Sequence, residues 1–370
     1  MKKLLFIVNV DWFFVSHRLP IAKKAVEEGF EVHLACDVTD KLEEIREAGI
    51  TVHIIPFSRS GVNFFKQVGT FIDLAKVVRS VSPNIIHGIS TIGVVFAGIL
   101  SQFFQTERLV ASISGLGYVF VDESLRARSL RWLVTFLYRM ALRSASSIIF
   151  QNKDDHAIFL KRKIASNQNS ILIRGSGVDL DKFYYTSEPT GDLIVMFVAR
   201  LLKDKGIIEF SEAAKIIRQR ANARFVVVGD LDPCNPNSLS TAELNKLIKT
   251  EHVEYWGFSD DVNQVMPRSH IIVLPSYREG LPKSLIEASA CGRPVVTTDV
   301  PGCRDAIIPD VTGLLVQAKD VTGLVEAIEN LLNNKQRRLS FGNAGRKLAE
   351  EHFDINGVVA KHLSIYTSEA

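Results

Sequence analysis

Short apolar runs alternate with segments of helical periodicity along the first half of the chain. The run at residues 4–10 is rich in apolar and β-branched residues, as in a strand that is covered on both faces. The next segment places Leu19, Ala22 and Val26 at helical spacing, and Gly29 suits the end of that helix. The same pattern predicts further strands at residues 31–35, 52–55, 85–87, 109–113, 147–151 and 171–173. Strands that alternate with helices predict a parallel sheet covered on both faces.

A second alternating series follows a polar connection. The stretch after Gly175 contains Gly, Pro and paired aspartates without apolar periodicity, which is typical of an interdomain segment. The second series predicts strands at residues 193–199, 225–229, 253–257, 270–276 and 294–298. We therefore predict an α/β chain of two doubly wound, Rossmann-like domains that face each other across a cleft. The predicted bounds are residues 1–185 and 186–350, with a helix at about residues 351–370 that packs back on the first domain.

One uncharged segment is long enough to suggest a membrane span. Residues 80–106 contain no Asp, Glu, Lys or Arg. Proline, glycine and polar residues interrupt the segment near its start, however. We expect a short buried strand at residues 84–87, a turn, and a buried helix from about Thr91 rather than a transmembrane helix.

The composition is that of a folded protein in a reducing compartment. The 370 residues exceed what one core usually carries, and 46% hydrophobic with 23% charged residues leaves little room for long disordered segments. The four cysteines form no CxxC pair, so neither a disulfide framework nor a zinc site is expected. The amino-terminal apolar stretch meets Asn9 and Asp11 early, and no small-residue cleavage site follows. We expect a cytoplasmic protein.

Basic residues are concentrated in the first half. Residues 1–185 carry 23 Lys and Arg against 17 Asp and Glu, whereas the remaining residues carry 21 against 24. A basic, apolar first half favours an anionic surface or a phosphate-bearing partner, although an ordinary solvated face has the same composition. No nucleic-acid partner is expected.

The segment SYREGLPKSLIEASACGRPVV places two glutamates around a predicted helix start. Glu279 lies in the loop, and the helix is expected to begin near Pro282, whose ring suits the first helical position. Glu287 then lies on the helix, so one carboxylate reaches a ligand above the helix and the other lines its side. The amides of Gly280 and Leu281 offer an anion site at the same end. Taken singly, each glutamate is better explained without a ligand, Glu279 as an acidic residue that stabilises the helix dipole and Glu287 as a solvated helix residue.

A basic loop follows the first strand of the second domain. FVARLLKDKG places Arg200 and Lys205 at the mouth of the same sheet. Arg offers a planar fork to phosphate oxygens and Lys a mobile point charge. A diphosphate held by both would be stabilised as a leaving group. Alone, a basic loop after a strand is more often solvated surface.

Together these two segments resemble the retaining nucleotide-sugar glycosyltransferases of family four, which have the GT-B fold. The resemblance covers essentially the whole chain and rests on the two glutamates, the following ACGRPVV, Gly302 and Gly313, and the Arg-x4-Lys-Gly loop. It implies that Arg200 and Lys205 bind the donor diphosphate. Together with Glu279, they are the expected catalytic residues.

The resemblance also implies the remaining donor contacts. Glu279 is expected to contact sugar hydroxyls beside Gly280 and Leu281, and Glu287 the ribose. The base is expected against the strand-end loop of Trp256, Gly257 and Phe258. A UDP-hexose or UDP-N-acetylhexosamine is the expected donor.

The first half looks like the branch of this family that extends sugars on undecaprenyl diphosphate in bacterial glycan assembly, such as O-antigen, capsule or glycoprotein glycan. This likeness rests on DWFFVSHRLPIAKKAVEEGFEVHLA, the FSRSGVNFF loop and SISGLGYVF. It implies a lipid-linked saccharide acceptor at the amino-terminal domain. The expected acceptor-binding residues are His17, Arg18, Arg59, Gly115 and Gly117. A histidine beside a helix start is also consistent with a purely structural role.

The chain departs from the family in two loops. The loop after the first strand reads NVDWFFVSHRL and lacks the Gly-Gly pair with which many relatives approach the donor phosphate. Ser114, Gly115, Leu116 and Gly117 stand where many relatives carry an active-site histidine. That histidine's sugar contact therefore cannot be transferred to this chain, and glycine amides are expected in its place.

Two segments of the first half combine basic with aromatic residues. Residues 59–79 contain Lys66 among phenylalanines, and residues 125–143 interleave arginines with Trp132 and Phe136. Either suits an interfacial helix on the inner face of the cell membrane, where each basic residue contributes about 1 kcal/mol. Peripheral, reversible attachment is expected. The alternative is an amphipathic helix that packs only on its own sheet.

For retention we expect a front-face reaction without a protein nucleophile. The acceptor hydroxyl attacks from the side that the nucleotide leaves, and the departing phosphate accepts its proton. No cofactor is expected to be required, although magnesium can influence the rate without being bound by the protein. Asp230 and Asp232 in GDLDPCNP match a metal-binding DxD motif only superficially.

Two other functions stay open. The same scaffold can act on a soluble sugar or a protein acceptor, or can bind a nucleotide sugar without catalysis. A dinucleotide oxidoreductase would need GxGxxG after a strand, and neither half contains it.

Overall fold

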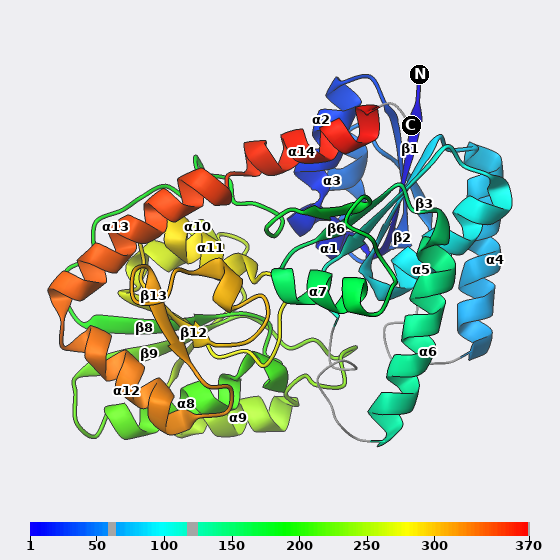
Figure 1. The fold of residues 1–370 in the computed structure, drawn as a ribbon. Coiled ribbons are helices and arrows are strands. Elements are labelled where there is room, and N and C mark those ends of the chain that lie inside the picture. Colours follow the sequence, from blue (N-terminus) through cyan, green and yellow to red (C-terminus); the bar gives the residue numbers. More distant parts are fainter. Residues whose placement is uncertain (58–63, 117–124, 369–370) are drawn as a thin grey trace. The chain divides into compact units, whose positions relative to one another are not determined.

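The computed structural model describes residues 1–57, 64–116 and 125–368, which divide into two compact units (Figure 1). The first unit is Met1–Ser176 with Ile355–Ala370, and the second is Gly177–Asp354. The predicted boundary at residue 185 is therefore wrong. Residues 177–185 join the second unit because the Val178 N–H donates to the Phe353 carbonyl. Phe183 also lies in the hydrophobic core of the second unit.

Among the described residues, the first unit contains a seven-stranded parallel sheet in the order β3-β2-β1-β4-β5-β6-β7. The strands are β1 (Lys3–Val10), β2 (Glu31–Asp37), β3 (Thr51–Ile54), β4 (Ile85–Ile89), β5 (Arg108–Ile113), β6 (Ser147–Phe150) and β7 (Ser170–Leu172). The helices are α1 (Asp11–His17), α2 (Leu19–Glu27), α3 (Leu42–Glu47), α4 (Phe64–Val81), α5 (Ser90–Phe104), α6 (Leu125–Ala141), η2 (Leu142–Ser144), α7 (Lys153–Lys161) and α14 (Ile355–Thr367). The winding reverses between β1 and β4, as in a doubly wound sheet.

Successive side chains of β1 enter two different cores, because helices cover both faces of the sheet (Figure 1). Leu4 and Phe6 belong to the core under α2 and α14, whereas Leu5 and Ile7 belong to the core under α4, α5 and α6. This arrangement explains why the strand reads as a continuous apolar run instead of an alternating one.

The uncharged segment forms the buried strand β4 and the helix α5, as predicted. Glycines let α5 approach its neighbours, since a Cβ on Gly93 would lie 2.8 Å from the Ile7 carbonyl oxygen. One on Gly98 would overlap the Ala141 carbonyl at 2.2 Å. Within the part of the chain that the structure describes, no helix is both long and apolar enough to cross a bilayer.

The second unit contains, in its described residues, a six-stranded parallel sheet in the order β10-β9-β8-β11-β12-β13. The strands are β8 (Leu193–Val198), β9 (Ala223–Val228), β10 (Glu254–Gly257), β11 (Ile271–Leu274), β12 (Val295–Thr298) and β13 (Gly313–Val316). The helices are η3 (Lys203–Lys205), α8 (Ile207–Ile217), α9 (Thr241–Lys249), α10 (Val262–Val265), η4 (Met266–Arg268), α11 (Lys283–Ala290), η5 (Arg304–Ala306), α12 (Val321–Leu332) and α13 (Lys335–His352). Here the winding reverses between β8 and β11.

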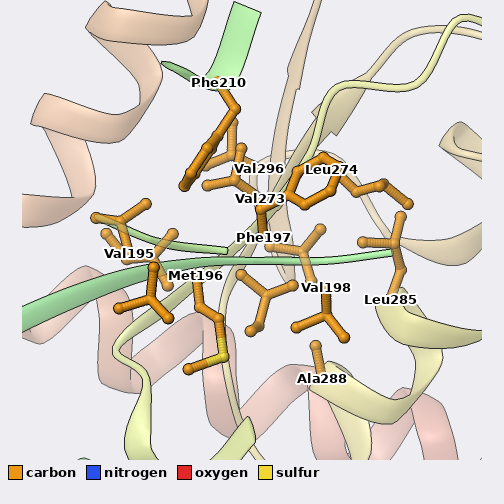
Figure 2. Packing of buried hydrophobic residues seen from close by; sticks show 14 of the residues in the cluster. Val195, Met196, Phe197, Val198, Phe210, Val273, Leu274, Leu285, Ala288 and Val296 are labelled. Atoms are coloured by element: carbon orange, nitrogen blue, oxygen red, sulfur yellow. The ribbon is translucent and has the colours of Figure 1, made fainter. Parts of the chain in front are cut away.

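Buried apolar side chains pack on both faces of the second sheet. Figure 2 shows Phe197 on the same side of β8 as Phe210 of α8, and Met196 on the side of Ala288 of α11. The ring centroids of Phe197 and Phe210 are 5.5 Å apart. β8 pairs in parallel with β11, with Met196 opposite Ile272, so the carboxyl ends of these two strands lie side by side.

A buried polar cluster attaches α14 to the first sheet. The hydroxyls of Tyr366 and Ser112 each lie 2.7 Å from a ring nitrogen of His87. His362 donates from Nδ1 to the Val358 carbonyl at 2.8 Å. Burial, with the nearby Arg18 charge, lowers the pKa of His362 from 6.5 to about 3.

We predict that this cluster makes the protein acid-sensitive. An unfolded histidine takes up a proton below pH 6.5 and the buried His362 does not, so the free energy of unfolding falls as the pH drops from 6.5 toward 3. At pH 5 the loss is about 2 kcal/mol for this residue. Urea unfolding at pH 7 and pH 5 should show that His362→Asn removes this part of the pH dependence. His352→Asn, at an exposed position on α13, is the control. An unchanged pH dependence in His362→Asn would contradict the assignment.

Candidate active site

Two loops at the carboxyl edge of the second sheet bring Lys205 and Glu279 together. Lys205 ends the loop that follows β8, and Glu279 lies in the loop that follows β11. The Lys205 Nζ donates to Glu279 Oε1 at 2.5 Å, and both side chains are largely buried. Because β8 and β11 are the neighbours at which the winding reverses, this pair lies where open α/β sheets bind ligands.

Close backbone contacts fix the two loops. Gly206 has φ +78°, and a Cβ there would lie 2.3 Å from the Pro275 carbonyl oxygen. Gly302 has φ +82°, and its Cβ would lie 2.5 Å from the Glu279 carbonyl oxygen. Only glycine combines this left-handed backbone with so close an approach. The positions of the ammonium and the carboxylate are therefore set by the main chain.

Arg200 lies in the same loop as Lys205. Its Nη1 donates to Asp232 Oδ2 at 2.6 Å, and the Asp232 amide donates to the Ser238 hydroxyl at 3.0 Å. The guanidinium is partly exposed at the carboxyl edge of the sheet. Asp232, which the sequence offered as a superficial metal motif, serves here as the partner of this guanidinium.

The helix after Glu279 begins one residue later than expected. Pro282 is the N-cap residue with extended backbone, and α11 starts at Lys283. Gly280 and Leu281 therefore precede the cap, and their amides are not amides of the first helical turn. The first-turn donors belong to the residues from Lys283 onward, and the anion site on the Gly280 and Leu281 amides stays a prediction.

Glu287 lies on the buried side of α11. Burial raises the pKa of this carboxyl group, whereas the charges of Lys283 and Lys182 lower it. The Lys283 Nζ is 3.5 Å from Glu287 Oε1. A solvated helix residue is thereby excluded, and the structure presents instead a buried carboxylate with one ammonium beside it.

The loop predicted to contact the base follows β10. Gly257 has φ +77° and its carbonyl accepts the Gly229 N–H at 2.9 Å, while the Phe258 ring is exposed. The Arg268 guanidinium lies 4.2 Å from the centroid of Trp256. An exposed aromatic ring at this edge can stack on a planar base.

The candidate acceptor residues of the first unit do not form one described cluster. Arg18 is only 1% exposed and donates to the His17 carbonyl at 2.9 Å. The expected role of Arg18 as an accessible residue that binds the acceptor is therefore not supported. His17 stacks on Phe13 with ring centroids 4.3 Å apart. Gly115 has φ +115°, as a backbone-approach residue would. Arg59 and Gly117 lie outside the described residues.

Family models match most of each unit of the chain. Residues 182–348 match the family model described as glycosyl transferases group 1, and residues 3–152 match glycosyl transferase 4-like. A Campylobacter jejuni protein, N,N'-diacetylbacillosaminyl-diphospho-undecaprenol alpha-1,3-N-acetylgalactosaminyltransferase, is 30% identical over 95% of this chain and 97% of its own. This chain belongs to the glycosyltransferase family.

Other relatives and structures extend the comparison. An Escherichia coli UDP-Gal:alpha-D-GlcNAc-diphosphoundecaprenol alpha-1,3-galactosyltransferase is 23% identical over 92% of this chain and 89% of its own. The structure of Anabaena HepE in complex with UDP superposes with a TM-score of 0.80 at 16% identity, with full coverage of both chains. WaaG, a glycosyltransferase of lipopolysaccharide biosynthesis, gives 0.76 at 16% identity over 99% and 100% of the chains. The fold of this glycosyltransferase is GT-B, as predicted.

Sequence reasoning missed two residues of this glycosyltransferase's site. Asp232 was visible only as part of a DxD pattern, and its contact with Arg200 depends on how two loops meet. Tyr277 follows β11 without any motif that marks it, yet its N–H donates to the Asp204 carbonyl at 2.9 Å. Both contacts join segments that are far apart in the sequence.

Proposed function

We propose that this glycosyltransferase moves a hexose or N-acetylhexosamine from a UDP-sugar onto a polyprenyl-diphosphate-linked saccharide, with retention at the anomeric carbon. The observation that carries the proposal is the Lys205–Glu279 ion pair at the reversal point of the second sheet, with Arg200 in the same loop. The Campylobacter and Escherichia coli relatives support the acceptor, because their names specify diphospho-undecaprenol-linked sugars. The Escherichia coli relative also supports UDP as the carrier.

In this proposal the two cations stabilise the leaving diphosphate. The bond between the anomeric carbon and the phosphate oxygen breaks with its electron pair passing to UDP, while the acceptor oxygen bonds to the same face of that carbon. The departing phosphate oxygen takes the acceptor proton, so no protein nucleophile is needed. Lys205 and Arg200 offset the charge that develops on the diphosphate.

The carboxylates have binding roles in the proposal. Glu279, held by the Lys205 ammonium, accepts hydrogen bonds from sugar hydroxyls, beside Gly280 and Leu281. Glu287 accepts from the ribose hydroxyls, and the base stacks near Gly257 and Phe258. A carboxylate offers about four lone-pair sites, so Glu287 keeps acceptor capacity for such hydroxyls beside its contact with Lys283.

We further propose that transfer requires no protein-bound metal. Asp232 is engaged by Arg200 at 2.6 Å, which leaves its carboxylate neutralised by a protein cation. Among the residues that the structure describes, no three His, Cys, Asp or Glu side chains gather as metal ligands would.

In this proposal the first unit binds the acceptor and contacts the membrane through α6. Its Trp132 and Phe136 side chains are 72% and 50% exposed, and their rings stack with centroids 6.0 Å apart. Beside them the pKa of Arg162 is lowered by burial and by the charges of Arg131 and Arg139. Arginines that gather in spite of mutual repulsion, next to exposed rings, suit an anionic headgroup region. Such contact would hold the enzyme peripherally at the inner face of the cell membrane.

A transfer assay tests the function. We expect one UDP-sugar of a panel to release UDP in the presence of a polyprenyl-diphosphate-linked saccharide. The product mass should rise by one sugar, the anomeric NMR coupling should match the donor, and transfer should persist in the presence of EDTA. Transfer only to a soluble sugar or a protein would overturn the acceptor, and UDP-sugar binding without UDP release would overturn catalysis.

Arg200→Ala and Lys205→Ala test the site. Each should reduce kcat at saturating donor by roughly 30- to 1000-fold, since one well-placed charge at a transition state is worth about 2 to 4 kcal/mol. Lys203→Ala is the matched control, because this exposed lysine of the same turn pairs with Glu243 at 2.7 Å. Near-normal rates in the first two variants would exclude their assignment.

Sedimentation with phosphatidylglycerol vesicles tests the membrane contact. The double variant Trp132→Ser and Phe136→Ser should partition at least about tenfold more weakly, because it loses two rings that would be buried. Salt should weaken binding of the native protein. Tyr184→Ser, an exposed aromatic of the second unit, is the control. If this double variant binds the vesicles as the native protein does, and Phe65→Ser with Ile72→Ser weakens binding, the membrane contact lies on α4 instead.

A further inference from the structure

We propose that Tyr277 is a positioning residue for the Lys205–Glu279 pair, acting together with Glu209; the inference rests on the donor site proposed above. Tyr277 lies two positions before Glu279. Its N–H donates to the carbonyl of Asp204, the residue that precedes Lys205, at 2.9 Å. The main chain beside the carboxylate is thus tied directly to the main chain beside the ammonium.

The phenol of Tyr277 ties its loop to α8, the helix that directly follows the Lys205 loop. Its hydroxyl donates to Glu209 Oε1 at 2.5 Å, in the first turn of α8. Glu209 is only 8% exposed, and its other oxygen, Oε2, is buried without a hydrogen-bond partner. The Tyr277 hydroxyl therefore supplies a hydrogen bond that a buried carboxylate needs, and a buried charge without one is costly.

A third loop contacts the ring of the same tyrosine. The Lys319 Nζ lies 4.9 Å from the Tyr277 ring centroid, from the loop that follows β13. Lys319 itself has φ +66°, a left-handed backbone that is uncommon for a residue with a side chain. Burial, the bond to Glu209 and the charges of Asp204 and Glu212 raise the pKa of the phenol, so it stays a donor at neutral pH.

These contacts touch neither the ammonium of Lys205 nor the carboxylate of Glu279. Any effect of Tyr277 on the reaction must therefore pass through the relative position of the two loops. A misplacement of about 1 Å at reacting groups can cost on the order of 100-fold in rate. The proposed donor contacts of Glu287, on α11, and of Phe258, after β10, lie outside the two loops that Tyr277 joins, so donor affinity should change less than kcat.

The test is Tyr277→Phe in the intact protein, assayed with the UDP-sugar that the transfer assay identifies. We expect kcat to fall roughly 10- to 100-fold while the donor KM and the calorimetric affinity for UDP change less than about threefold. Tyr138→Phe, which removes a buried hydroxyl bonded to Thr91 in the first unit, should leave kcat unchanged. A native kcat in Tyr277→Phe would overturn the proposal.

Two further variants separate positioning from simple structural support. Glu209→Gln keeps an oxygen that accepts from the phenol and should retain most of kcat. In the double variant Tyr277→Phe with Glu209→Gln, the unpaired buried charge is gone, so the urea midpoint should recover toward the native value. The proposal predicts that kcat stays low there, because the bond between the Tyr277 loop and α8 is still absent. Recovery of kcat together with stability would overturn it.

A failure of this proposal can be distinguished from a failure of the proposed function. If Lys205→Ala loses activity and Tyr277→Phe does not, the positioning role of Tyr277 is excluded, whereas the proposed donor site is retained. If Lys205→Ala keeps full activity, the donor site itself fails.

Discussion

The ion pair between Lys205 and Glu279 is the interaction on which the rest of the site depends. The two residues are distant in sequence, and they meet because β8 and β11 are neighbours in a parallel sheet whose winding reverses between them. Gly206 lets the Lys205 loop approach the main chain after β11, and Gly302 lets the loop after β12 approach the main chain of Glu279. A largely buried ammonium and carboxylate interact more strongly than the same groups in water, so their geometry is well determined.

Each charged side chain around this pair contacts one side chain of the protein that carries the opposite charge or donates a hydrogen bond. Arg200 is held by Asp232, Glu287 by Lys283, and Glu209 by the hydroxyl of Tyr277. Each partner fixes a charged side chain without covering the whole of its polar surface. In the proposed function, a nucleotide diphosphate would meet charged side chains that protein partners already orient, which is the condition for electrostatic catalysis.

The sequence predicted much of the fold because parallel strands covered on both faces read as continuous apolar runs. It also predicted the loops that carry Arg200 and Glu279, since these follow directly from strand ends. It did not predict that residues 177–185 join the second unit, because their hydrogen-bond partner, Phe353, lies at the far end of that unit. The burial of Arg18 was missed for a similar reason. Its neighbours His362 and Tyr366 come from α14, and no local pattern around an arginine reveals a helix contributed by the other end of the chain.

The crystal structure of the protein with UDP tests the central claim most directly. The account predicts that diphosphate oxygens lie within hydrogen-bonding distance of the Arg200 guanidinium and the Lys205 ammonium, with the ribose hydroxyls on Glu287. A diphosphate bound elsewhere, with these three side chains in contact only with protein, would contradict it.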